Sequence, residues 1–267
     1  MLGLTAIATL LTISVLFFIL GYLAWRGASS LNVAFFTHLP APVGEPGGGM
    51  ANAIVGSAKL LVIAAVTGVP IGLLAGIYLA EFASRPAAFA VRYAADLLNG
   101  VPSIVIGIFA YAIVVLPMGR FSTLAGGIAL GVMMIPIGVR STEEYLRAVP
   151  ASLREASLAL GAARSTTIVR VVLPAAMRGI VTAMMLNLAR VAGETAPLLF
   201  TAFNNQFWSR GIDQPTASLP VMIFNYAISP YEDWHRQAWA AGLVLLVLVM
   251  AANVGARLLL GRTARAA

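Results

Sequence analysis

The sequence predicts an all-α, polytopic membrane protein with six transmembrane helices and a polar helix–turn–helix segment. Hydrophobic residues make up 60% of the 267 residues and charged residues only 10%, and the mean hydropathy of +0.91 excludes a soluble globular protein. Six apolar stretches are long enough to cross a bilayer, which takes about 20 helical residues. One long segment, residues 140–178, is polar but keeps the apolar spacing of a helix.

The predicted spans are residues 4–23, 54–79, 97–116, 121–139, 180–202 and 239–260. In domain terms, residues 1–25 hold the first span, residues 26–52 form an outer loop, residues 53–260 form the core with the polar segment 140–178, and residues 261–267 form a tail. No lysine or arginine precedes the first span, so a cleaved signal peptide is not expected. An even number of spans places both ends on one side.

The arginines predict which side is cytoplasmic, because loops on that side carry the excess of positive charge. With both ends inside, eleven arginines lie in inner segments: Arg85, Arg92, the six from Arg140 to Arg178, Arg257, Arg262 and Arg265. Only four lie outside: Arg26, Arg120, Arg210 and Arg236. All four tryptophans fall at the predicted outer boundary, where amphipathic rings are favoured. We therefore expect a multi-pass protein of the cytoplasmic membrane with the polar segment inside.

Several spans contain helix breakers. Pro70, Gly100-Val101-Pro102, Pro136 and Pro197 lie in or near apolar runs, and neighbouring helices or water must bond the backbone groups that they free. Asn99 and Ser103 flank one of these breaks. They are candidates either for hydrogen bonds between helices or for contacts with a transported ligand.

The polar segment is predicted to fold as two amphipathic helices at the membrane surface. The first helical piece ends by Val149, because the residue before Pro150 is disfavoured in the α conformation. The second stops at Gly161, the residue type preferred for a left-handed cap. A further helix begins at the N-cap Ser165, and Leu173-Pro174 breaks the chain and turns it back toward the bilayer.

A second candidate site surrounds Arg190, which lies near the middle of the predicted fifth span. A charge at that depth costs about 2.5–3.5 kcal/mol on insertion scales and should face a polar interior. Glu194, one turn further out, is expected to share its face, with Asn187 and Thr195 as polar neighbours. Arg190 either grips an anion through its planar fork, with Glu194 orienting it, or forms a structural ion pair.

Lys59 is the only lysine and lies within the predicted second span, roughly two turns from its outer end. Two interpretations are open: its side chain extends to the membrane surface, or it helps to draw an anion into the entrance.

The polar segment resembles the EAA loop of ABC-importer permeases. The match consists of Glu155-Ala156-Ser157, Gly161, Val171 and Leu173-Pro174 at that family's spacings. Ser157 stands where the family has alanine and Val171 where it has isoleucine, and both changes are conservative in volume. The resemblance implies a type I ABC-importer permease whose loop docks on a cytoplasmic ATPase, with Glu155, Ala156, Ser157, Gly161, Leu173 and Pro174 as the coupling residues.

Further motifs resemble the PstA-type permeases of phosphate importers: Asn52–Ser57, Gly76–Glu81, Asn99–Ile104, Thr142–Glu144 and Arg190–Phe200. The resemblance extends from Asn52 to the carboxyl end. It implies alternating-access import of inorganic phosphate with a PstC-like second permease, a PstB-like ATPase dimer and a PstS-like external phosphate-binding protein. Arg190 and Glu194 match the charged pair of the family's translocation path.

The sequence contains no nucleotide-hydrolysing motif of its own. A phosphate-binding loop needs lysine followed by serine or threonine after a glycine-rich turn, and Lys59 is followed by Leu60. His38 and His235 lack a second ligand at metal spacing, and there is no cysteine. We therefore expect a non-catalytic subunit without metal or cofactor, with ATP and Mg²⁺ on the partner ATPase.

Alternative functions remain open. Phosphonate, sulfate or molybdate is also compatible, because one arginine does not distinguish tetrahedral oxyanions. A proton-coupled secondary carrier or a purely structural membrane subunit is a further alternative, although neither explains the EAA-like loop.

Overall fold

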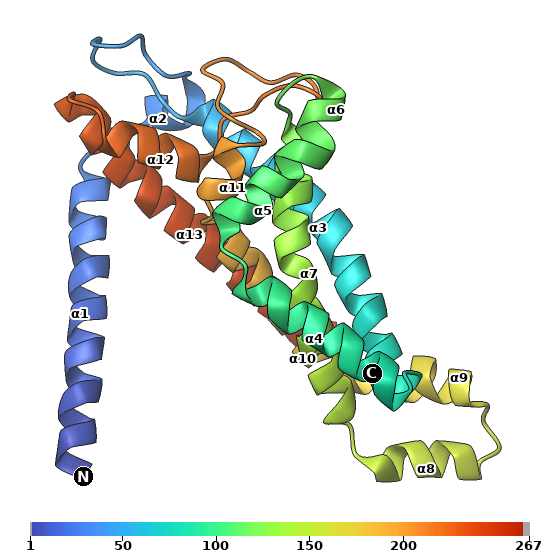
Figure 1. Cartoon of the computed structure of the whole chain (residues 1–267). Coiled ribbons are helices and arrows are strands. Elements are labelled where there is room, and N and C mark those ends of the chain that lie inside the picture. Colours follow the sequence, from blue (N-terminus) through green and yellow to red (C-terminus); the bar gives the residue numbers. More distant parts are fainter. Residues whose placement is uncertain (1, 264–267) are drawn as a thin grey trace.

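The computed structural model describes residues 2–263, and this range is helical without a β-strand (Figure 1). The α-helices are α1 Leu2–Ala28, α2 Val33–Thr37, α3 Ala51–Glu81, α4 Arg85–Gly100, α5 Ser103–Ala110, α6 Leu116–Met118, α7 Thr123–Arg147, α8 Ala151–Ala159, α9 Arg164–Thr167, α10 Leu173–Val191, α11 Ala196–Leu199, α12 Leu219–Ala227 and α13 Glu232–Thr263. Two π-helical segments are η1 Tyr111–Val115 and η2 Ile168–Val172. The last four residues of the expected tail, residues 264–267, lie outside the described residues.

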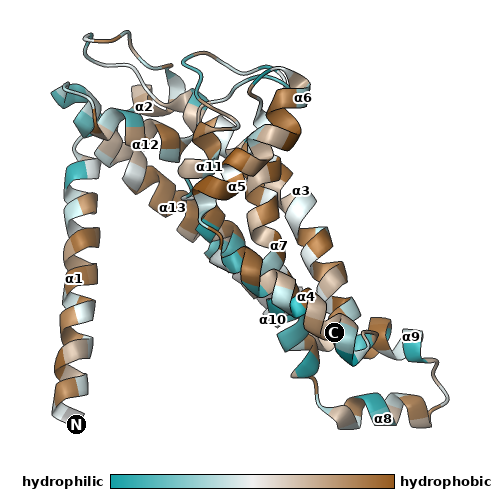
Figure 2. Cartoon of the chain, in the orientation of Figure 1, coloured by the Kyte–Doolittle hydropathy of each residue, from teal (hydrophilic) through white to brown (hydrophobic). Residues whose placement is uncertain are grey.

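The expected all-α membrane architecture is confirmed. Within the described range, five helices are long and apolar enough to cross a membrane, and the count becomes six if the bent pair α4 and α5–α6 forms one span. Hydrophobic residues dominate these long helices (Figure 2). The amino end of α1 lies at the same end of the molecule as α8, and the loops around α2 lie at the opposite end (Figure 1). This arrangement agrees with the expected topology.

The centre of the bundle is the packing of α3 against α7, which small residues make close. A Cβ on Gly76 would lie 2.5 Å from the Cβ of Thr142, and one on Gly68 would lie 2.7 Å from the carbonyl oxygen of Gly131. Glycine at these positions lets the two helix backbones approach each other. Pro70 and Pro136 lie inside these continuous helices and do not end them.

The third predicted span, residues 97–116, is not one straight helix. α4 and the helix that begins with α5 meet at an angle of 102°. Val101 is extended, with φ −71° and ψ 128°, because Pro102 disfavours the α conformation in the residue before it. The break at Gly100-Val101-Pro102 is thus confirmed, but its angle was not predicted.

The fourth predicted span, residues 121–139, continues as α7 to Arg147. The first piece of the polar segment is therefore the end of a membrane helix, and the prediction of a separate surface helix there was wrong. Of the polar segment, only α8 and α9 project from the bundle, and we call the segment from Pro150 to Thr167 the arm (Figure 1).

The predicted break at Leu173-Pro174 is also wrong. The chain stays helical from Arg164 to Val191 and forms one candidate span. Proline lacks an N–H group and its ring clashes with the carbonyl four residues earlier. The π-helical turn η2 relieves both problems, since Leu173 N–H bonds to the Ile168 carbonyl five residues back. The same device, η1, precedes Pro117.

The predicted fifth span, residues 180–202, ends early. α10 stops at Val191, and α11 begins only at Ala196 after a short turn. Pro197 in the first turn of α11 cannot continue a preceding helix, and Gly193 weakens the helical conformation before it. Gly107 of α5 packs against this second segment, because a Cβ there would lie 2.6 Å from the Cα of Pro197.

The α3–α7 packing leads to a prediction about stability. Gly76→Val should lower the free energy of unfolding by about 1–3 kcal/mol, the usual cost of overpacking, because the new side chain would overlap Thr142. Denaturant unfolding of the detergent-solubilised protein measures this. Gly21→Val on α1 is the matched control, since nothing lies within 4 Å of a Cβ there. Equal stability of the two variants would contradict the close-packing argument.

Candidate functional site

The arm presents its first helix to solvent. Seven of the nine residues of α8 are exposed, including Glu155 and Ala156, and only Arg154 and Ser157 are half-buried. Ser157 faces the second helix of the arm, with its hydroxyl 2.9 Å from that of Thr167. The predicted coupling residues Glu155 and Ala156 are therefore accessible to another molecule, while Ser157 has a role inside the arm.

The turn after α8 has the predicted glycine cap. Gly161 has φ +79°, its N–H donates to the Leu158 carbonyl at 2.9 Å, and the Ala162 N–H donates to the Ser157 carbonyl at 3.3 Å. These two bonds form the Schellman arrangement that closes a helix. The following helix begins at Arg164 with Ala163 as its N-cap, two residues before the predicted cap Ser165. The prediction of Ser165 was wrong because Ala163 already takes the extended conformation.

The arm is fixed to the bundle by residues that the sequence analysis did not single out. Arg154 of α8 donates through Nη1 to Glu81 Oε1 at 2.5 Å and through Nη2 to the Leu146 carbonyl at 2.7 Å. Arg164 of α9 donates to the Glu81 carbonyl. The available signal was a carboxylate at the end of an apolar span, opposite a segment rich in arginine.

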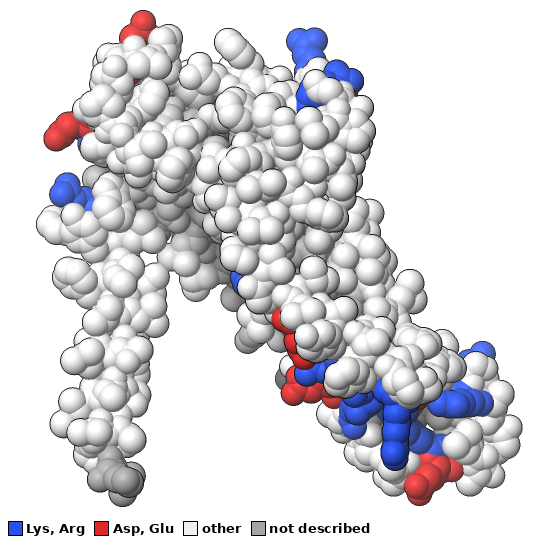
Figure 3. Space-filling view, viewed as in Figure 1, with Lys and Arg blue, Asp and Glu red and all other residues white. Residues whose placement is uncertain are grey.

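A second buried carboxylate joins α4 to α7. Glu143 accepts hydrogen bonds from Arg92 Nε at 2.9 and 3.1 Å and from Arg92 Nη2 at 2.5 Å. Arg147 Nε lies 3.1 Å and Arg140 Nη1 3.6 Å from the same carboxylate. These residues and Glu144 line an open cavity of about 500 Å³. Figure 3 shows this gathering of arginines at the arm end of the molecule.

The neighbourhood of Arg190 differs from the prediction. Arg190 lies in the last turn of α10 and is exposed, whereas Glu194 is half-buried in the turn after that helix. The two therefore do not share a helix face, and no ion pair joins them in the described part of the chain. The guanidinium of Arg190 has no hydrogen-bond partner within residues 2–263. The alternative of a structural Arg190–Glu194 pair is not supported by this geometry.

The polar neighbours of Arg190 have different environments. Asn187 is buried and donates from Nδ2 to the Met134 carbonyl at 2.8 Å, so it holds α10 to α7. Its Oδ1 is buried without a partner among the described residues. Thr195 is half-buried next to Glu194 and does not cap α11 through its side chain. Asn187 therefore supports the position of α10, and Thr195 remains near Arg190 in the chain.

Asn99 and Ser103 lie on the two sides of the 102° bend. Asn99 is exposed and Ser103 is half-buried. The structure does not bring these two residues into contact with Arg190 through any hydrogen bond that it describes, so their place in a transport path stays a prediction.

Lys59 bonds to the outer loop, and its expected role in drawing an anion into the entrance stays a prediction. Its Nζ donates to the Ser209 carbonyl at 2.6 Å and so holds the loop between α11 and α12. Asn52 Nδ2 donates to the Asn205 carbonyl at 2.7 Å, and Ser57 Oγ accepts from Leu219 N–H at 2.8 Å. The outer part of α3 thus holds the segment that runs from the loop after α11 to the first residue of α12 through three side chains.

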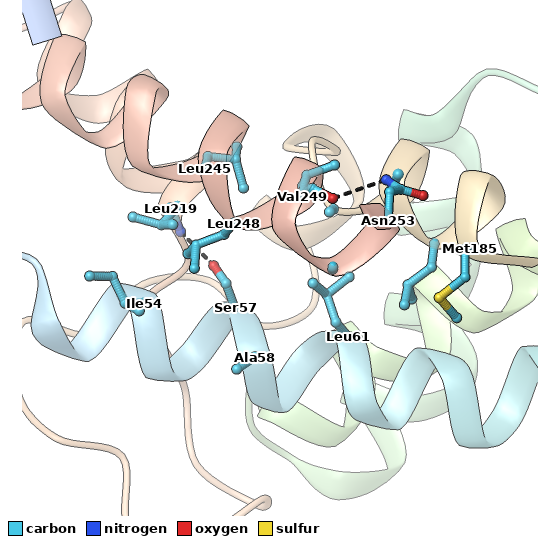
Figure 4. Close-up of a pocket in the computed structure, with 14 residues that line it drawn as sticks. Ile54, Ser57, Ala58, Leu61, Met185, Leu219, Leu245, Leu248, Val249 and Asn253 are labelled. Atoms are coloured by element: carbon cyan, nitrogen blue, oxygen red, sulfur yellow. Dashed lines mark hydrogen bonds between the residues drawn. The ribbon is translucent and has the colours of Figure 1, made fainter. Parts of the chain in front are cut away.

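An apolar crevice of about 210 Å³ lies between α3, α10 and α13 (Figure 4). Ile54 and Leu61 of α3 point toward Leu245 and Leu248 of α13 across it (Figure 4). Its polar atoms are used locally, as in the Asn253 Nδ2 to Val249 carbonyl bond. An oxyanion would lose its hydration there without gaining donors, so this crevice is unsuited to an anion.

The sequence matches a known family of membrane proteins and several of its members. Residues 68–265 match the family "Binding-protein-dependent transport system inner membrane component". The chain is 44% identical over 264 residues to the phosphate transport system permease protein PstA of Yersinia pestis, covering 96% of this chain and 90% of the relative. It is 35% identical to the probable PstA permease of Methanocaldococcus jannaschii, covering 93% and 88%.

Solved structures share the fold. A bacterial alginate ABC transporter in complex with an alginate pentasaccharide-bound periplasmic protein has a TM-score of 0.67 at 16% identity, covering 94% of this chain and 92% of that chain. The inward-facing MetNI methionine ABC transporter has a TM-score of 0.63 at 23% identity, covering 81% and 96%. At these identities the likeness concerns the fold alone.

The contact of Lys59 leads to a prediction about the outer loop. Lys59→Met removes the donor to the Ser209 carbonyl, and trypsin added to the outer side should then cut after the neighbouring Arg210 about tenfold faster, as expected for loss of one charged hydrogen bond. The appearance of the fragment on a gel measures the rate. Lys59→Arg keeps a donor and should be cut at the original rate. An unchanged rate in Lys59→Met would show that the loop is held by its other bonds.

Proposed function

Since the chain belongs to the family of inner membrane components of binding-protein-dependent transport systems, we propose that it is the permease subunit of an ATP-driven importer of inorganic phosphate. The observation that supports phosphate as the substrate is the 44% identity, over 96% of this chain, to a relative named as a phosphate transport permease. The chain also offers a cationic group suited to such a substrate, the guanidinium of Arg190, which has no bonded partner within residues 2–263.

The arm is the proposed contact with the ATPase. Glu155 and Ala156 lie on the exposed side of α8, whereas Arg154 and Ser157 hold the other side. A partner can therefore bind α8 without displacing the contacts that fix it. Under this proposal ATP and Mg²⁺ bind to the partner ATPase, and this chain takes no part in the hydrolysis itself.

Arg190 is the proposed contact with phosphate. Its fork of N–H groups matches two oxygens of a tetrahedral oxyanion. It is exposed on this chain and lies at the end of α10 that is farther from the arm. Glu194 and Thr195 lie in the adjoining turn, where they are available to a substrate or to a second, PstC-like permease. A PstS-like protein would deliver phosphate at the outer face.

The route from ATP to substrate is one continuous helix. Arg164 of the arm and Arg190 lie near the two ends of the helical stretch Arg164–Val191, which at 1.5 Å per residue is about 40 Å long. A displacement of the arm would tilt this stretch and move Arg190 with it. Alternating access then follows from rigid-body tilting, with the turn at residues 192–195 as the point where α10 moves relative to α11.

The distribution of charge indicates which end of the molecule is cytoplasmic. The arm and the amino end of α1 lie at one end of the molecule (Figure 1), and that end carries the excess of arginine (Figure 3). By the positive-inside rule this end is cytoplasmic. The proposed location is the cytoplasmic (inner) membrane, with both termini inside.

The role of Arg190 is tested by uptake of labelled phosphate in cells with the complete transport system. Arg190→Ala should lower uptake at least about thirtyfold, the effect of removing one member of a desolvated charge pair, at an unchanged amount of protein in the membrane. Arg190→Lys should retain part of the uptake, because it keeps the charge but loses the fork. Normal uptake by Arg190→Ala would remove this residue from the path.

The role of the arm is tested by Glu155→Lys. The reversed charge should abolish phosphate uptake and release the ATPase from the purified membrane complex, because Glu155 is exposed and makes no contact that stabilises the arm. Glu45→Lys, a reversal at an exposed residue of the outer loop, should change neither. Retention of both uptake and ATPase by Glu155→Lys would exclude α8 as the docking helix.

A further inference from the structure

The guanidinium of Arg154 connects three helices at the inner end of the molecule. It lies on α8, bonds to the carboxylate of Glu81 at the end of α3, and bonds to the carbonyl of Leu146 near the end of α7. We propose that Arg154 and Glu81 form a clamp that transmits the movement of α8 to α3 and α7, and that Arg154 is a positioning residue for transport. This inference rests on the proposed function.

The clamp is shielded from water. The side chain of Glu81 is 6% exposed and that of Arg154 is 26% exposed. A charge pair in such a place is held firmly, because removal of one partner leaves the other desolvated and unpaired. Other arginines of the same polar segment do not form such a pair. The side chains of Arg170 and Arg178 are exposed and have no bonded partner within residues 2–263.

A second contact keeps the clamp from acting as a hinge. Arg164, the first residue of α9, donates to the backbone carbonyl of Glu81, and its guanidinium lies 5.4 Å from the centre of the Phe82 ring. The hydroxyls of Ser157 and Thr167 join α8 to α9. Both helices of the arm are thus attached to the same end of α3, and they can move only together with it.

The clamp provides a second route by which movement of the arm reaches the bundle, in addition to the continuous helix that includes α10. The connections on both sides of α8, residues 148–150 and 160–163, lie between helices. Without the clamp they could bend and absorb a push on α8. With it, the push reaches α3, which packs along α7 through Gly68 and Gly76. The two sides of the bundle, α3–α7 and α10, then respond to one event at the ATPase.

The first experiment separates coupling from folding. Arg154→Gln keeps a polar side chain but shortens it and removes the charge, so at equal protein in the membrane it should lower the phosphate transported per ATP hydrolysed by at least about tenfold, with the ATPase still bound. Arg178→Gln removes an exposed arginine without partners and should keep the ratio. An unchanged ratio in Arg154→Gln would overturn the proposal, because a merely structural role changes the amount of transporter and not the ratio.

The second experiment restores the connection chemically. The chain has no cysteine, so Glu81→Cys with Arg154→Cys, in a transporter whose other chains also lack cysteine, introduces the only two thiols. A short, reducible thiosulfonate cross-linker should raise phosphate transport per ATP in this variant, and reductant should lower it again. A monofunctional thiosulfonate should have no such effect. Cross-linking without recovery would overturn the clamp as the transmitting contact.

The outcome also distinguishes the clamp from the function on which it rests. If Glu155→Lys abolishes uptake while Arg154→Gln keeps the normal ratio, the arm couples transport without the clamp. If Glu155→Lys itself transports normally, the proposed function of the arm fails before the clamp is in question.

Discussion

The continuity of the helix from Arg164 to Val191 is the constraint on which the rest of the structure depends. Pro174 would break an ordinary α-helix, but η2 shifts the backbone bonds to a spacing of five residues and keeps the rod intact. The second helix of the arm, α9, and Arg190 therefore lie on one continuous helix. Near its two ends this helix is held by Arg164, which donates to the Glu81 carbonyl, and by Asn187, which donates to the Met134 carbonyl.

Paired charges lie at the two ends of the molecule. At the inner end, Glu81 and Glu143 are buried and each is bonded to arginine; at the outer end, Lys59 fixes the loop before α12. Buried charges persist only when they are paired in this way. Arg190, in the last turn of α10, is one of several charged groups without a side-chain partner within the described residues. Under the proposed function, this leaves its guanidinium available to bind and release an ion.

Some local features could be predicted from the sequence, although the predicted break at Pro174 and the predicted cap at Ser165 were wrong, and distant contacts could not be predicted. The cap at Gly161 and the break at Pro102 depend on neighbouring residues and were found where expected. The end of α10 was missed because apolar composition continues past Val191, although the chain leaves the helix there. Lys59 and Ser209 are 150 positions apart, and Glu81 and Arg154 are 73 apart. No periodicity connects such pairs, since tertiary packing alone brings them together.

The geometry at Arg190 also bears on selectivity. A single fork can bind two oxygens but cannot enclose a tetrahedral oxyanion, and Glu194 lies apart from it in a different segment. Discrimination between phosphate and another oxyanion needs several fixed donors, because a site rejects an analogue mainly through buried polar groups left unpaired. Under the proposed function, this chain therefore supplies the charge that moves, while the remaining donors come from the second permease and the choice of substrate is made largely by the external binding protein.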